Sequence, residues 1–146
     1  MTEPVTSDPS SRYYVDTSAY LCVVLGEDGH EQIATELSGA FLYSSSLLVL
    51  EATRNLIRLS REGSLPPADL EHCLSQLEKD IALFALRDLT LDLCCGRTLP
   101  VVSTPRSLDL AHLRTALWFH AREPLRRFVT LDADQAQSAR ELGLPV

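Results

Sequence analysis

The chain has 146 residues, of which 45% are hydrophobic and 23% charged, a composition typical of a soluble globular protein. Its formal net charge of -7 argues against a protein dedicated to duplex DNA, because such proteins usually carry a basic balance. No stretch approaches the roughly 20 apolar residues of a membrane helix and the N-terminus has no signal-peptide pattern, so we expect a cytoplasmic protein without membrane contact.

The first part of the chain predicts strands that alternate with helices. Residues 1–12 are polar and contain proline, which is typical of a mobile tail. Aromatic and β-branched residues predict a strand at Tyr13–Val15. Helical patterns follow at Ala19–Leu25 and His30–Leu37, and a second apolar run predicts a strand at Ala40–Tyr43.

The middle of the chain predicts a helical hairpin. Three serines at 44–46 are placed to cap a helix that begins at Leu47 and ends before Gly63. Pro66 and Pro67 stand at the start of a second helix, a position where proline is tolerated. The apolar surface of this hairpin predicts contact with a partner helix or a second copy of the chain.

The last third repeats the alternation. We expect strands at 83–86, 127–131 and 144–146, and helices at 90–97, 107–122 and 132–142. Strands that alternate with helices predict a parallel sheet covered on both faces, a three-layer α/β/α fold. Nothing marks a boundary inside residues 13–146, so we expect one domain there.

Two acidic residues directly follow predicted strands. Asp16 comes after Tyr13–Val15, and Asp132 comes at the end of the strand near the C-terminus. Ligands of parallel sheets bind beyond the carboxyl ends of the strands, which makes both residues candidates for a site. Aspartate is also a favoured helix cap, and each residue alone is better explained as a cap than as a ligand.

Two further acids lie in helices. Glu51 is surrounded by apolar residues, where a carboxylate is costly unless it is paired or binds a cation; the alternatives are exposure to solvent or a pair with Arg54 or Asn55. Asp109 stands in the first turn of its helix, where the helix dipole alone would favour it.

Taken together, the four acids Asp16, Glu51, Asp109 and Asp132 predict a metal site. Carboxylates brought to one place repel each other unless cations hold them. Hard oxygen ligands select Mg²⁺ or Mn²⁺, and such a centre activates water for attack on a phosphodiester. Asp134, two residues beyond Asp132, remains an alternative or additional ligand.

Four segments resemble the motifs of PIN-domain ribonucleases, in the order of that family and over nearly all of residues 13–146. Their size and details are most similar to the VapC-like toxins of bacterial toxin–antitoxin pairs. The segments are Tyr14–Ala19, Ser44–Arg54, Arg106–Ala116 and Phe128–Asp132, the last followed by Ala136, Ala139 and Leu142–Val146.

The resemblance implies a PIN-like fold and a metal-dependent endoribonuclease. In that family's pattern Asp16, Glu51, Asp109 and Asp132 hold one or two Mg²⁺ or Mn²⁺ ions, and a cognate antitoxin protein is the expected partner. A homodimer is expected from the apolar surface of the helical hairpin. Thr17 and Thr130 match hydroxyl positions beside the first and last acids, where they support the site or serve as cap and strand residues. Gln135 stands where the family usually has an apolar residue, which predicts looser packing.

Other side chains have weaker patterns. His112 and His120 lie two turns apart on one predicted helix, which suits a proton relay or two ordinary core or surface histidines. Trp118 and Phe119 suit base stacking or core packing. The arginines at 122, 126 and 127 form a local basic group for RNA backbone contacts or a solvated surface.

Two other functions remain open at this point. A non-catalytic PIN-like module that binds protein or RNA agrees with the acidic balance and the altered closing motif. A different Mg²⁺-dependent phosphohydrolase on a similar sheet would act on phosphomonoesters instead of RNA.

Overall fold

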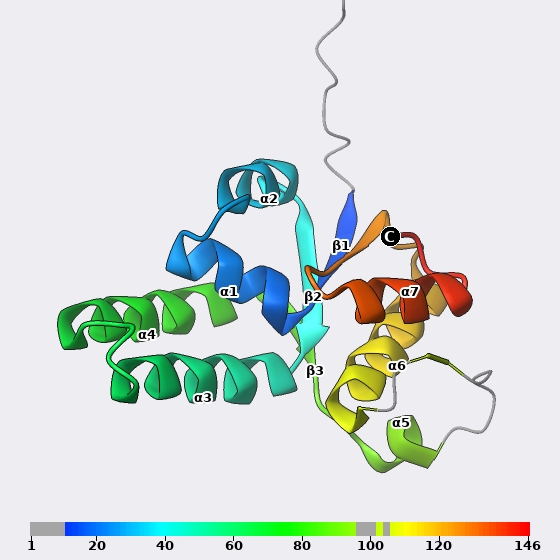
Figure 1. Ribbon diagram of the computed structural model, residues 1–146. Coiled ribbons are helices and arrows are strands. Elements are labelled where there is room, and N and C mark those ends of the chain that lie inside the picture. The colour runs from blue at the N-terminus through cyan, green and yellow to red at the C-terminus, as the bar shows by residue number, and fades with distance from the viewer. Residues whose placement is uncertain (1–10, 96–101, 104–105) are drawn as a thin grey trace, which may run out of the picture.

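The computed structural model describes residues 11–95, 102–103 and 106–146. Helices and strands alternate along these ranges, as Figure 1 shows. In chain order the elements are β1 (Arg12–Val15), α1 (Thr17–Leu25), α2 (His30–Leu37), β2 (Phe41–Ser45), α3 (Leu47–Arg61), α4 (Pro67–Ile81), β3 (Phe84–Arg87), α5 (Leu91–Cys95), α6 (Ser107–Arg122), β4 (Arg127–Val129) and α7 (Ala133–Glu141).

The four strands form one sheet in the order β3-β2-β1-β4, and every neighbouring pair is parallel. Parallel neighbours require crossover connections, which here are helical. Helices α1 to α4 cover one face, while α6 and α7 cover the other with α5 beside α6 (Figure 1). The predicted three-layer α/β/α architecture is therefore confirmed.

The alternation of side chains in β1 divides the core into two halves. Tyr13 and Val15 pack with residues of α1 to α4, whereas Tyr14 packs with α6, α7 and Phe128 of β4. The rings of Tyr14 and Phe128 are stacked with centroids 5.2 Å apart. A strand buried on both faces reads as a nearly continuous apolar run, which explains why β1 is clear in the sequence.

The start of the first strand differs from the prediction. Ser11 is buried and its carbonyl accepts a hydrogen bond of 2.9 Å from the backbone N–H of Phe41. Arg12 already belongs to β1. These two residues are therefore part of the sheet, and the rest of the predicted tail, residues 1–10, lies outside the described residues.

Two predicted strands end two residues away from where the structure ends them, and a third predicted strand, residues 144–146, is absent. Strand β2 continues through Ser44 and Ser45, which are fully buried, and Ser44 Oγ donates to the Val15 carbonyl at 2.7 Å. Strand β4 ends at Val129, because Leu131 is 55% exposed and its N–H turns to Ser18 Oγ. Residues 144–146 form no strand, but the Pro145 carbonyl accepts a hydrogen bond from the N–H of Phe128 in β4.

The predicted helical hairpin is present as α3 and α4. None of the helices in the described ranges is both long and apolar enough to cross a membrane. The cysteines are free thiols, with Cys22 and Cys73 buried and Cys94 and Cys95 exposed.

Candidate functional site

One pocket of about 280 Å³ is lined by all four acids that the sequence singled out. Asp16 directly follows β1 and Asp132 follows β4, so both stand at the carboxyl edge of the sheet. Glu51 comes from the second turn of α3 and Asp109 from the first turn of α6. The remaining lining residues are Thr17, Ser18, Leu21, Asn55 and His112.

Asp16 serves as the N-cap of α1 and lines the pocket at the same time. Its Oδ1 accepts from the Ala19 N–H at 3.1 Å and from Ser18 Oγ at 2.7 Å, although the side chain is almost fully buried. Burial raises the pKa of Asp16, and hydrogen bonds from Thr130, Ser18 and the Ala19 N–H offset this only in part. The pocket therefore holds a carboxylate that gains from any added positive charge.

Asp132 likewise serves as the N-cap of α7 and lines the pocket. Its Oδ1 accepts from the backbone N–H groups of Asp134 and Gln135 at 2.9 and 3.2 Å. Its Oδ2 lies 3.8 Å from Arg106 Nη1, an ion pair. Asp134 is exposed and does not line the pocket, so the geometry favours Asp132 over this alternative.

The Glu51 carboxylate is held by two side chains rather than by Arg54, Asn55 or solvent, and Asn55 Nδ2 donates to the Glu51 backbone carbonyl instead. His112 Nε2 lies 2.6 Å from Glu51 Oε1, and Thr17 Oγ1 donates to the same oxygen at 2.9 Å. Burial raises the pKa of Glu51, but the hydrogen bond and charge of His112 and the Thr17 hydroxyl outweigh it, so the net pKa is below the ordinary value. Glu51 is thus an ionised carboxylate at neutral pH.

His112 is the site residue that sequence reasoning undervalued. It is 2% exposed, and its Nδ1 lies 2.7 Å from the Tyr14 hydroxyl. The signal in the sequence was its spacing from Asp109, because residues three apart on a helix share a face. A histidine one turn after an acidic residue at a helix start therefore points toward the same site.

Asp109 is tied to α7 through its backbone. Its carbonyl accepts from Gln135 Nε2 at 3.0 Å, while the Gln135 N–H bonds to Asp132. Gln135 is 1% exposed, so the looser packing predicted for it is wrong; its side chain links the two helices that carry these acids. Its Oε1 is buried without a hydrogen-bond partner in the described part of the chain.

The two predicted hydroxyl residues contact the acids. Thr17 donates to Glu51 as described, and the Thr130 hydroxyl accepts from the Asp132 N–H at 3.1 Å. Thr130 also lies 3.3 Å from Ser18 Oγ, the hydroxyl that donates to Asp16. Thr17, the first residue of α1, therefore orients the Glu51 carboxylate, and Thr130 contacts the Asp16 carboxylate and the Asp132 backbone.

The chemistry of the pocket suits a hard cation, although no coordination sphere is preformed. Carboxylates from four separate elements converge on it, a donor set typical of Mg²⁺ or Mn²⁺. Across residues 11–95, 102–103 and 106–146, no three His, Cys, Asp or Glu side chains are arranged to hold one metal ion. Hydrogen bonds to caps and to His112 hold the acids in their present positions.

The other candidates from the sequence have structural partners. His120 Nδ1 accepts from the Leu125 N–H at 3.0 Å, a contact that does not involve the pocket. The guanidinium carbons of Arg87 and Arg122 lie 4.1 and 3.5 Å from the ring centroid of Trp118. Both arginines therefore pack on the Trp118 ring, which is the packing alternative for this residue.

The predicted basic group and the second aromatic residue are also absorbed by packing. Arg127 pairs with Glu36, and Arg122 lies on Trp118, whereas Arg126 is exposed. Phe119 packs against the Tyr43 ring, with centroids 4.6 Å apart. The three arginines therefore do not form one free basic cluster.

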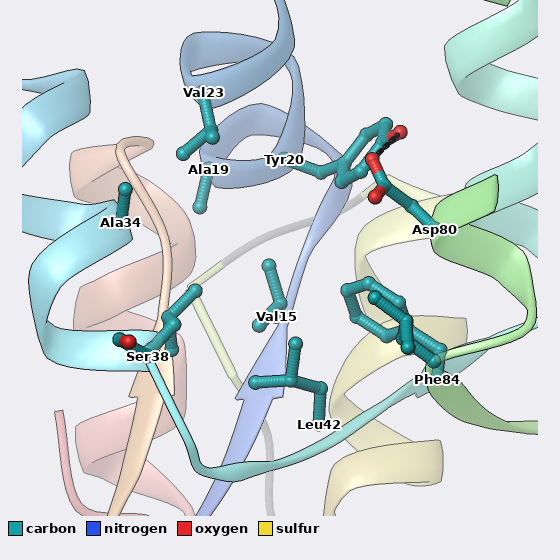
Figure 2. Close-up of a pocket in the computed structure, with 11 residues that line it drawn as sticks. Val15, Ala19, Tyr20, Val23, Ala34, Ser38, Leu42, Asp80 and Phe84 are labelled. Carbon is teal, nitrogen blue, oxygen red and sulfur yellow. Dashed lines mark hydrogen bonds between the residues drawn. The ribbon is translucent and has the colours of Figure 1, made fainter. Parts of the chain in front are cut away.

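A second pocket lies on the α1 to α4 side of the sheet and is mainly apolar. Its volume is about 240 Å³, and Figure 2 shows Val15, Val23 and Leu42 around it. At one side the Tyr20 hydroxyl donates to Asp80 at 2.8 Å. This pocket lacks the converging carboxylates of the first, and we therefore place the candidate chemistry in the first.

A scan against models of protein families finds no match for this chain, and a search of curated proteins finds none.

Proposed function

We propose that this chain is a metal-dependent endoribonuclease of the PIN-like type, with a catalytic pocket formed by Asp16, Glu51, Asp109 and Asp132. The observation that carries the proposal is that these acids, distant in the sequence, line one pocket at the carboxyl edge of a parallel sheet. The motif resemblance to VapC-like toxins supports RNA as the substrate and a cytoplasmic toxin as the biological role.

The four carboxylates are the residues that would hold Mg²⁺ or Mn²⁺. A bound divalent ion would lower the pKa of a coordinated water and neutralise charge on a phosphodiester. The raised pKa of Asp16 agrees with this role, since a buried carboxylate without a nearby cation is disfavoured in its charged form.

Partners are proposed on the same resemblance. Apolar side chains are exposed on and after the helical hairpin: Leu50 is 68%, Ile57 40% and Leu83 72% exposed. Such a surface suits an antitoxin helix or a second copy of the chain. Light scattering at micromolar concentration should show a homodimer, and a protein that remains monomeric would refute that part.

The decisive experiment measures RNA cleavage by variants in which an acidic side chain of the pocket is replaced by its uncharged amide. Asp16→Asn and Asp109→Asn keep side-chain size and remove negative charge from the pocket. Each should slow cleavage in Mn²⁺ by about 100-fold or more, the scale seen when one charge-stabilising group is lost. Folding is checked by thermal unfolding of each variant.

Asp134→Asn is the matched control, because Asp134 is exposed outside the pocket. It should cleave at the wild-type rate, whereas Asp132→Asn should not. Wild-type rates in the Asp16 and Asp109 variants would show that the site is wrong. A wild-type protein that binds RNA without cleaving it would favour the non-catalytic module, and one that hydrolyses only phosphomonoesters would favour a phosphohydrolase.

A further inference from the structure

A buried chain of hydrogen bonds runs from the middle of the sheet to the pocket. Tyr14 is fully buried, and its hydroxyl lies 2.7 Å from His112 Nδ1. His112 Nε2 in turn lies 2.6 Å from Glu51 Oε1. The Tyr14 and His112 rings meet edge to face with centroids 5.9 Å apart, so packing fixes the imidazole plane as well.

In this chain of hydrogen bonds, both ring nitrogens of His112 have a partner. Thr17 Oγ1 donates to Glu51 Oε1 at 2.9 Å, and His112 Nε2 lies 2.6 Å from the same oxygen, so Nε2 is placed to donate a proton to the carboxylate. Tyr14 keeps its proton, because burial raises the pKa of the phenol. The hydroxyl lies against Nδ1 while Nε2 lies against the carboxylate, so contacts at both ring nitrogens fix the orientation of the His112 ring.

The bonds to Glu51 leave one of its oxygens available. His112 and Thr17 both donate to Oε1. Among the described residues, no hydrogen bond or ion pair reaches Oε2. The carboxylate is thus anchored through one oxygen on a residue that lines the pocket, with the second oxygen left for a ligand.

We infer that Tyr14 and His112 are positioning residues that orient the Glu51 carboxylate for a divalent cation. The inference rests on the proposed function for the cation. Its own content is the hydrogen-bonded chain, in which His112 acts on the metal only through Glu51. Partners of this kind restrict the rotamers of a ligand before it binds, and losing one typically costs 10–100-fold in metal affinity.

The test compares His112→Gln with His112→Asn, two variants that differ in the length of the side chain. Glutamine can place an amide N–H where Nε2 stands, whereas asparagine is too short to do so. In calorimetric Mn²⁺ titrations, His112→Asn should weaken binding about 10- to 100-fold, and His112→Gln should restore most of it. Tyr14→Phe should cause a smaller loss. His120→Asn is the control, since its oxygen can replace the Nδ1 acceptor far from the pocket, and it should bind Mn²⁺ like the wild type.

A second measurement needs no metal. In ¹⁵N NMR spectra of the metal-free wild type, His112 should show a protonated Nε2 that is hydrogen-bonded to the Glu51 carboxylate, and Tyr14→Phe should shift the Nδ1 signal. Folded His112→Gln protein that loses as much affinity as His112→Asn would overturn the inference, and so would unchanged ¹⁵N signals in Tyr14→Phe. If the wild type binds no Mn²⁺, the proposed metal site fails and the positioning role fails with it. Tight Mn²⁺ binding in every His112 variant would refute the positioning role alone.

Discussion

Replacing Asp16 by asparagine should stabilise the fold while it removes a proposed metal ligand. Asp16 is 5% exposed, and its pKa is raised by burial despite the hydrogen bonds of Thr130, Ser18 and Ala19. Because the folded-state pKa exceeds that of the unfolded chain, ionisation of Asp16 costs free energy in the folded protein. Asparagine has no charge to bury, and it is as good a helix cap as aspartate.

The expected gain is on the order of 1 kcal/mol at neutral pH, the scale typical when a functional site is relieved of a disfavoured group. For a domain of this size that corresponds to a rise in Tm of about 3 °C. Asp16→Ala separates charge from cap, because alanine offers no acceptor to the Ala19 N–H or the Ser18 hydroxyl. Losing the cap costs about 1 kcal/mol, so the alanine variant should be less stable than the asparagine variant by that amount.

The assay is thermal and urea unfolding in EDTA from acid to neutral pH. Below the unfolded-state pKa of about 3.9 Asp16 is protonated in both states, so wild type and Asp16→Asn should have equal stability. As the pH rises through the raised pKa of the folded protein, the wild type should lose stability relative to the variant. The reasoning is refuted if Asp16→Asn is less stable at pH 7, or if its advantage does not shrink in acid.

Three further predictions follow from the same structure. Glu51→Gln should change stability in the opposite direction to Asp16→Asn, because the lowered pKa of Glu51 means that its charge stabilises the fold above its unfolded pKa. The variant should lose about 1 kcal/mol of unfolding free energy at pH 7 in urea. The difference from the wild type should disappear as the pH falls through the lowered pKa. Phe128→Ala should cost about 3–5 kcal/mol in the same assay, because Phe128 is fully buried and stacked on Tyr14. Mn²⁺ at 100 times its Kd should stabilise the wild type by about 2.7 kcal/mol, an effect that EDTA reverses and that the Asp16→Asn, Asp109→Asn double variant lacks.

The sequence predicted the elements well where one physical signal dominated. Helix α2 and helix α6 have the expected bounds, His30–Leu37 and Ser107–Arg122, because helical spacing and a glycine or polar boundary agree there. The serines at 44 and 45 were misjudged, since polar residues after an apolar run are typical of a cap. Their hydroxyls are satisfied inside the fold, Ser44 by the Val15 carbonyl and Ser45 by the Leu47 N–H, so the strand continues through them.

The site was predictable in its acids and not in the contacts that hold them. The carboxyl edge of a parallel sheet collects whatever follows its strands, so Asp16 and Asp132 could be placed from the order of elements alone. The pairing of Glu51 with His112 joins residues 61 positions apart. It depends on how α6 lies across the sheet, which no local pattern encodes. The covering of Trp118 by Arg87 is of the same kind, since β3 and α6 meet only in the folded chain.

For Asp16 and Asp132 the sequence set two interpretations against each other, a helix cap and a metal ligand, and the geometry shows why they are compatible. A carboxylate has two oxygens with about four acceptor positions. In Asp132 the cap uses Oδ1, while Oδ2 lies at the separate ion pair with Arg106. A capping bond fixes the rotamer of the side chain and so directs the second oxygen, as His112 does for Glu51. Capping is therefore one of the means by which this fold orients its acids. Asp132→Ala should then reduce both helix stability and metal affinity, whereas Asp132→Asn should reduce metal affinity alone. Equal stability of the two variants in urea would contradict the shared role.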